Sequence, residues 1–214
     1  MAEQLDVPAD SAVHRYLDAL VDRARTTLPD NLVGVYVTGS LATGGYLQDL
    51  SDIDVMLVVD ASLDHATKAA VIDRLRNSAL PCPTRGLELV IYRREVVAIG
   101  RTDPAFELEL NDGPRMAFRS TSTPSDRPPE DGTFWYALDR DIVRQRGIAL
   151  LGPPSADVFG ALSEPELAAV IDEADRWHTE HAPGTENAAR NARRGRIRIE
   201  TGKWLSKRSP QVSD

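Results

Sequence analysis

A short apolar run that ends in a glycine–serine pair is the feature that most constrains how this 214-residue chain can fold. Residues 32–37 are rich in valine and lead directly into Thr38, Gly39 and Ser40, a pattern that predicts a buried strand opening onto a loop. Such a loop exposes backbone N–H groups and a hydroxyl with little obstruction from side chains, which suits phosphate oxygens. The segment therefore predicts an anion-binding turn.

Two aspartates follow after a spacer of 11 residues, at the start of a second predicted strand over residues 53–60. Asp52 and Asp54 are two positions apart, so in a strand their carboxylates point to the same side while Ile53 faces the core. Adjacent carboxylates repel each other unless a cation lies between them, and oxygen ligands suit Mg²⁺ bridged to phosphates. The pair indicates a site for Mg²⁺ with a nucleoside triphosphate.

Glu88 interrupts a third apolar run, over residues 87–92, which predicts another strand. An unpaired carboxylate in an apolar strand is costly unless it is paired or faces a site. On a neighbouring strand, Glu88 could face Asp52 and Asp54 and either hold metal or act as general base toward an attacking hydroxyl. Each of these features alone is usually a turn or a solvated strand end, but their order along the chain indicates function.

The remaining pattern predicts an α/β domain over residues 1–155 and a small all-helical domain over residues 156–214. Residues 121–132 have the composition of an exposed loop, a linker or an active-site flap. Further predicted elements are helices over 10–28, 63–80, 134–146 and 187–201, a helix capped by Ser163, a weak strand over 115–119 and a short strand over 148–151.

Residues 32–60 resemble the nucleotidyltransferase motif of the DNA polymerase β superfamily. Five further pieces resemble, in their order, the bacterial streptomycin and spectinomycin adenylyltransferases: residues 87–90, 104–108, 138–142, 150–154 and 200–207. The resemblance implies a polymerase β-like nucleotidyltransferase domain, with a mixed sheet and flanking helices, followed by a shortened helical domain. It also implies transfer of AMP from MgATP to an antibiotic hydroxyl, with pyrophosphate leaving.

The same resemblance implies roles for individual residues. Asp52, Asp54 and Glu88 would be the catalytic and metal-binding acids, with Glu88 as general base. The nucleotide would be held by Gly39, Ser40, Ser51, Arg194 and Lys207. Trp177 and Glu180 lie roughly where the family contacts its drug, although Trp177 fits core packing equally well. The family's aromatic residue in the first domain has no counterpart, because the matching stretch reads Asn111, Asp112, Gly113.

Charge and composition predict the kind of partner and compartment. The formal net charge of −8 favours a small cationic substrate and disfavours bulk nucleic acid, despite the basic cluster over residues 187–208. Cys82 is the only cysteine, which fits a reducing compartment. No apolar run approaches the roughly 20 residues of a membrane span, and the acidic start does not resemble a secretory signal. We expect a cytoplasmic monomer that does not bind membranes.

Two other functions remain open from the sequence. One is a nucleotidyltransferase that modifies a protein or a tRNA, as in toxin and antitoxin pairs. The other is a nucleotide-binding remnant without catalysis. His178 and His181 lie three residues apart in a predicted helix, and with no obvious third ligand we expect them to be surface residues.

Overall fold

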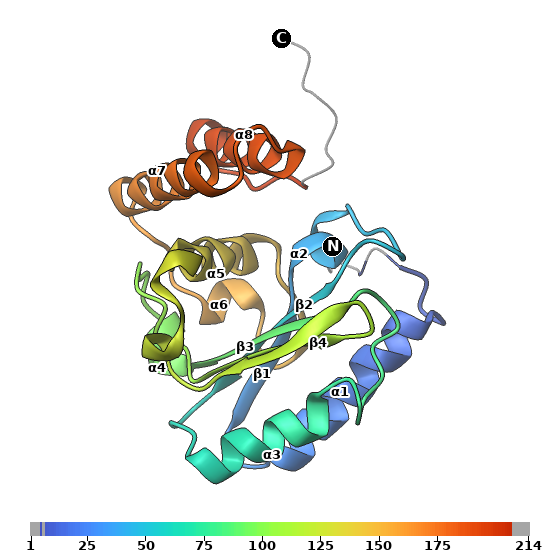
Figure 1. Cartoon of the computed structure of the whole chain (residues 1–214). Helices are drawn as coiled ribbons and strands as arrows, with labels where there is room; N and C mark the ends of the chain where they lie inside the picture. Colours follow the sequence, from blue (N-terminus) through green and yellow to red (C-terminus); the bar gives the residue numbers. More distant parts are fainter. Residues whose placement is uncertain (1–4, 6, 207–214) are drawn as a thin grey trace.

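The computed structural model describes residue 5 and residues 7–206. Within these residues the chain forms a six-stranded sheet in the order β5-β4-β3-β2-β1-β6, covered by helices on both faces (Figure 1). β2 and β3 are parallel and all other neighbours are antiparallel, so the sheet is mixed as expected. The strands are β1 Leu32–Val37, β2 Ile53–Val59, β3 Leu87–Arg93, β4 Leu108–Gly113, β5 Met116–Thr121 and β6 Ile148–Leu151.

The central strands are apolar on both faces because each face is covered by helices. Val35 and Val37 pack on the side of α1 (Ala12–Thr27) and α3 (His65–Leu75). Tyr36 and Met56 pack on the opposite side, against α5 (Phe134–Arg146). Asp54 shares the alternation of Met56 and therefore points to the α5 side of the sheet.

The helix boundaries follow local capping. Ser11 caps α1 by accepting a hydrogen bond from the backbone N–H of His14. The helix predicted over residues 63–80 is wrong at its C-terminal end, since α3 stops at Leu75. The backbone N–H of Asn77 instead donates to the Asp112 carboxylate at 2.7 Å, which holds the chain in a turn.

Two long helices follow the sheet, α7 (Glu164–His181) and α8 (Glu186–Thr201), and they pack on each other, with α7 also packing on α5 (Figure 1). Ser163 forms the predicted capping box with Glu166. The division of the chain near residue 155 stays a prediction. Short elements complete the fold: α2 Gly39–Thr43, α4 Arg94–Val97, α6 Ser155–Val158, and the 3₁₀ turns η1 Pro124–Asp126 and η2 Pro129–Asp131. In the described part of the chain, no helix combines the length and apolarity needed to cross a bilayer.

Candidate active site

A cleft of about 700 Å³ lies between one end of the sheet and the helices α5, α7 and α8. Its walls carry most of the residues that the sequence singled out, although they come from distant segments. The sheet side contributes Gly39, Ser40, Ser51, Asp52, Asp54 and Glu88, and α8 contributes Arg194. These residues therefore meet at a single site, whereas their roles remain predictions.

The turn between β1 and α2 can be built only with glycine. Gly39 has a φ of +61°, and a Cβ there would lie 1.8 Å from Asp54 Oδ2. The backbone N–H of Thr38 donates to the Asp54 carbonyl at 3.0 Å, which fixes the turn against β2. The glycine thus allows the turn and the Asp54 carboxylate to touch.

Two hydroxyls beside this turn have no partner. Ser40 Oγ and Thr38 Oγ1 are buried, and neither forms a hydrogen bond with any described residue. Both residues line the cleft. A buried polar atom without a partner is uncommon in folded proteins and is a mark of a site that binds a polar ligand. Ser51 differs, because its Oγ accepts a hydrogen bond from the Leu47 backbone N–H at 2.9 Å.

Replacing Ser40 by alanine tests whether its hydroxyl serves ATP binding and not the stability of the fold. The Ser40 hydroxyl contributes no hydrogen bond to the fold, so we expect unfolding free energy to be unchanged or raised. We expect ATP binding to weaken about tenfold, the value of one hydrogen bond to a charged group. Calorimetric titration with MgATP measures the affinity for ATP, and urea denaturation measures the free energy of unfolding.

Ser155→Ala is the matched control, since Ser155 is also buried but donates from Oγ to the Gly147 carbonyl at 2.9 Å, away from the cleft. We expect it to lose about 1 kcal/mol of stability and to bind ATP normally. Unchanged ATP affinity in Ser40→Ala would contradict a role for this hydroxyl.

Three carboxylates come together beside the turn. Asp54 and Glu88 are directly paired in the parallel register of β2 and β3, and Asp52 lies two residues before Asp54. Water in the cleft reaches Glu88, but the protein walls around it reduce its hydration. This burial, followed by the charges of Asp54 and Asp52, raises the pKa of Glu88 well above its usual range. A cation placed among these groups would relieve the repulsion.

The acids suit a divalent cation, although Asp52 is engaged elsewhere. Arg85 Nη1 donates to Asp52 Oδ2 at 2.6 Å, and both side chains are partly exposed. Among the residues that the structure describes, no group of three or more acidic, histidine or cysteine side chains is placed so that it could hold a metal ion as it stands. The neighbouring carboxylates and the unpartnered Ser40 hydroxyl fit Mg²⁺ with phosphate oxygens, and Asp52 would have to exchange Arg85 for the ion.

Arg194 faces the acids from α8. Its Nε donates to the Leu205 carbonyl at 2.7 Å, and its guanidinium lies over the Trp204 ring, 5.4 Å from the centroid. Burial lowers the pKa of Arg194, and the charges of Asp139 and Asp54 oppose that shift. An arginine remains protonated in this setting, so it supplies a fixed positive charge. Lys207, the predicted second cation, lies outside the described residues.

Comparison with known proteins shows which proteins this chain is similar to. Residues 17–104 match the family model described as "Nucleotidyltransferase domain". The chain is 27% identical over 172 residues to an aminoglycoside (3'') (9) adenylyltransferase of Klebsiella pneumoniae, covering 75% of this chain and 61% of the relative. Residues 17–104 are therefore similar to a nucleotidyltransferase domain.

The chain is also similar to spectinomycin adenylyltransferases. A spectinomycin 9-adenylyltransferase of Staphylococcus aureus is 29% identical over 133 residues, which is 60% of this chain and 49% of that protein. The chain thus spans about three fifths or less of the length of these relatives. A crystal structure of a spectinomycin adenyltransferase from Enterococcus faecialis, described with ATP and spectinomycin, covers 91% of this chain and 79% of its own at a TM-score of 0.64. Its 15% identity shows a shared fold.

The two predicted acceptor contacts belong to α7. Of the described residues that line the cleft, α7 provides Asp175 and His178, whereas Trp177 and Glu180 are not among them. Trp177 Nε1 donates to the Glu130 carbonyl at 2.9 Å and its ring stacks on His181. Glu180 is exposed. The acceptor role of Trp177 and Glu180 stays a prediction.

His178 corrects the expectation of a surface residue. It is only 4% exposed, and its ring lies edge-on to Trp135, with Nε2 3.0 Å from Asn191 Nδ2. Asn191 belongs to α8, so His178 joins α7 to α8 in the wall of the cleft. The burial depends on side chains far along the chain, which helix periodicity alone does not reveal.

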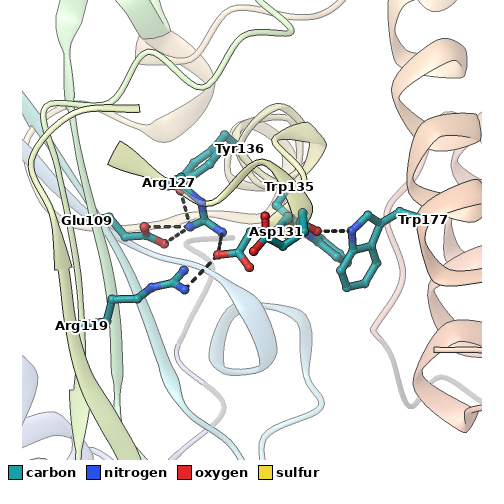
Figure 2. Close-up of polar contacts among 8 residues, drawn as sticks. Glu109, Arg119, Arg127, Asp131, Trp135, Tyr136 and Trp177 are labelled. Carbon is teal, nitrogen blue, oxygen red and sulfur yellow. Dashed lines mark hydrogen bonds and ion pairs between the residues drawn. The ribbon is translucent and has the colours of Figure 1, made fainter. Parts of the chain in front are cut away.

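A charged cluster between β4, β5 and the start of α5 was not predicted from the sequence (Figure 2). Arg127 Nη1 donates to both oxygens of Glu109, at 2.6 and 2.7 Å, and to the Tyr136 hydroxyl at 2.6 Å. Asp131 accepts from Arg127 Nη2 at 3.3 Å and from Arg119 Nη1 at 2.9 Å. The predicted exposed loop over residues 121–132 is therefore tied to the sheet by a buried arginine.

Removing this buried arginine should be costly. In Arg127→Met the Glu109 carboxylate is left buried without its partner, so we expect a loss of about 3 kcal/mol in unfolding free energy, measured by urea denaturation. Arg119→Met is the control, because its ion pair with Asp131 is partly exposed and should contribute less than about 1 kcal/mol. Equal losses in the two variants would contradict an anchoring role for Arg127.

Proposed function

We propose that this protein transfers AMP from MgATP to a hydroxyl of a small cationic acceptor, an aminoglycoside or aminocyclitol antibiotic, and releases pyrophosphate. The observation that carries the proposal is the meeting of Asp52, Asp54 and Glu88 with the unpartnered Ser40 hydroxyl in one cleft. This is the donor set that a metal-bound triphosphate requires. The names of the relatives support the choice of acceptor.

The nucleotide end of the site would be formed by the turn and by α8. Gly39 and Ser40 would contact the triphosphate through the backbone and the free hydroxyl, and Arg194 would stabilise the charge on the departing pyrophosphate. Asp52 and Asp54, joined by Glu88, would hold Mg²⁺, which neutralises phosphate charge and activates the attacking oxygen. Ser51 and Lys207 complete the predicted nucleotide contacts.

Glu88 would act on the acceptor. Its carboxylate takes the proton of the acceptor hydroxyl, whose oxygen forms a new bond to the α-phosphorus of ATP. The bond from that phosphorus to the bridging oxygen of the β-phosphate breaks, and pyrophosphate leaves with that electron pair. Phosphoryl-type transfer of this kind depends mainly on orientation and electrostatics, which the rigid sheet and the charged walls provide.

The charge of the whole chain supports a cationic acceptor. The cleft itself carries both signs, because its acids, which include Asp139 of α5 and Asp175 of α7, share the walls with arginines such as Arg194. The whole chain has a net charge of −8. Such a field raises the local concentration of a polyamine-like drug. The proposal includes a cytoplasmic monomer with a nucleotidyltransferase domain over residues 1–155 and a helical domain over residues 156–214, and size-exclusion chromatography tests the oligomeric state.

The deciding experiment is an AMP-transfer assay. Purified protein is incubated with Mg²⁺ and ATP labelled at the α-phosphate, together with streptomycin, spectinomycin or a related drug. We expect label on at least one drug and stoichiometric pyrophosphate. ATP binding with no transfer to any drug would overturn the choice of acceptor. Label that appears on a protein or a tRNA in cell extract would show that the acceptor is a macromolecule.

A further inference from the structure

We infer that Asp141 and Gln145 of α5 are positioning residues for nucleotide binding, because they fasten the chain segment that orients Arg194. The inference rests on the proposed function, in which Arg194 contacts phosphate. Neither residue touches the three acids of the site. They act through the turn that follows α8, over residues 202–205.

Asp141 is the buried anchor of this arrangement. Its side chain is on α5 and only 2% of the residue is exposed. It accepts three hydrogen bonds, from Trp204 Nε1 at 2.6 Å and from Arg198 Nε and Nη2 at 2.9 and 3.3 Å. A buried carboxylate is tolerated only when it is paired and hydrogen-bonded in this way. The contacts join α5 to α8 and to the segment beyond it.

Gln145 lies one helical turn after Asp141 and holds the same segment through the backbone. Gln145 Nε2 donates to the Gly202 carbonyl at 3.0 Å, and the Trp204 N–H donates to Gln145 Oε1 at 3.2 Å. Gly202 has a φ of +73°, which reverses the chain at the end of α8. The two α5 side chains therefore fix both the turn and the indole that follows it.

The fastened segment then forms the support of Arg194. The guanidinium lies over the Trp204 ring, and its Nε is held by the Leu205 carbonyl. A free arginine side chain loses considerable rotamer entropy when it binds phosphate, and prior fixation avoids that loss. With Nε occupied, the terminal nitrogens are the donors left to face the cleft, which Arg194 lines.

Apolar packing alone does not explain these polar contacts. Trp204 also packs with Ile142, Leu167 and Ile171, which is sufficient to bury the indole. Such packing is non-directional, whereas the hydrogen bonds of Asp141 and Gln145 fix the orientation of the Trp204 ring and the position of the turn at Gly202. The contribution of the polar pair should therefore appear in ligand binding as well as in stability.

The experiment compares folded full-length variants by calorimetric titration with MgATP and by steady-state kinetics. We expect Asp141→Asn and Gln145→Ala each to weaken ATP binding about tenfold and to raise the ATP KM in parallel, with kcat and acceptor KM changed less than about twofold. Gln145 is partly exposed, so its variant tests the inference even where Asp141→Asn folds poorly. Gln145→Glu retains an oxygen acceptor for the Trp204 N–H and should recover part of the affinity.

Arg140→Met is the matched control. Arg140 is the neighbour of Asp141 on α5 and is also buried, but it donates to the carbonyls of Arg101, Asp103 and Pro104, away from α8. We expect it to lower stability without weakening ATP binding. Normal ATP affinity in folded Asp141→Asn and Gln145→Ala would overturn the inference. Weakening of ATP binding by Arg140→Met to the same extent would also overturn it. Neither result would contradict the proposed function. Failure of the unmodified protein to bind MgATP overturns the proposed function and the inference with it.

Discussion

Replacing Glu88 by glutamine is expected to lower kcat for AMP transfer by roughly a thousandfold, the usual loss when a general base is removed. Glutamine keeps the shape of the side chain but cannot take a proton from the acceptor hydroxyl. Because burial and the charges of Asp54 and Asp52 already disfavour the ionised form of Glu88, a neutral amide at this position should cause no loss of stability. The labelled-ATP assay measures kcat, and thermal denaturation checks the fold.

Two further measurements make the Glu88 result specific. MgATP binding in Glu88→Gln should weaken far less than kcat falls, since Asp52, Asp54 and Ser40 are unchanged. Glu95→Gln is the control, because Glu95 is an exposed acid on α4 that does not line the cleft. It should transfer AMP at the unmodified rate. Full activity of Glu88→Gln would show that the proton is taken by another group.

The central part of the site could be predicted because it depends on short-range pattern. The alternation of β2 places Asp52 and Asp54 on one side, and the turn chemistry of Gly39 and Ser40 is visible in four consecutive residues. The placement of Glu88 opposite Asp54 needs the parallel register of β2 and β3. The sequence order suggested that pairing, and all three acids line the same cleft.

What the sequence did not predict depends on long-range contacts. β4 was missed because Glu109, Asn111 and Asp112 make it polar, and Glu109 is buried only through Arg127, 18 residues later. Asp112 is buried for a similar reason, as it binds the backbone of Asn77. Burial of a charged side chain requires a partner that sequence periodicity cannot identify.

A second large effect is expected at Gly39, where alanine should lower kcat/KM by about a hundredfold. The added methyl would overlap the Asp54 carboxylate, since a Cβ at this position would lie only 1.8 Å from Oδ2. Either the turn or the carboxylate must move by an ångström or more, and displacement of this size in a catalytic group has that order of cost. Kinetics with MgATP and the best acceptor, alongside MgATP titration, measure the loss.

Gly44→Ala separates the local clash from backbone strain. Gly44 ends the same short helix, α2, and has a similar positive φ of +76°, but a Cβ there meets no atom within 4 Å. Both alanine variants therefore carry the left-handed backbone penalty of about 1 kcal/mol, while only Gly39→Ala disturbs Asp54. If both variants lost activity equally, strain in α2 would be the cause. Loss confined to Gly39→Ala would instead show that contact between the turn and Asp54 is what the reaction requires.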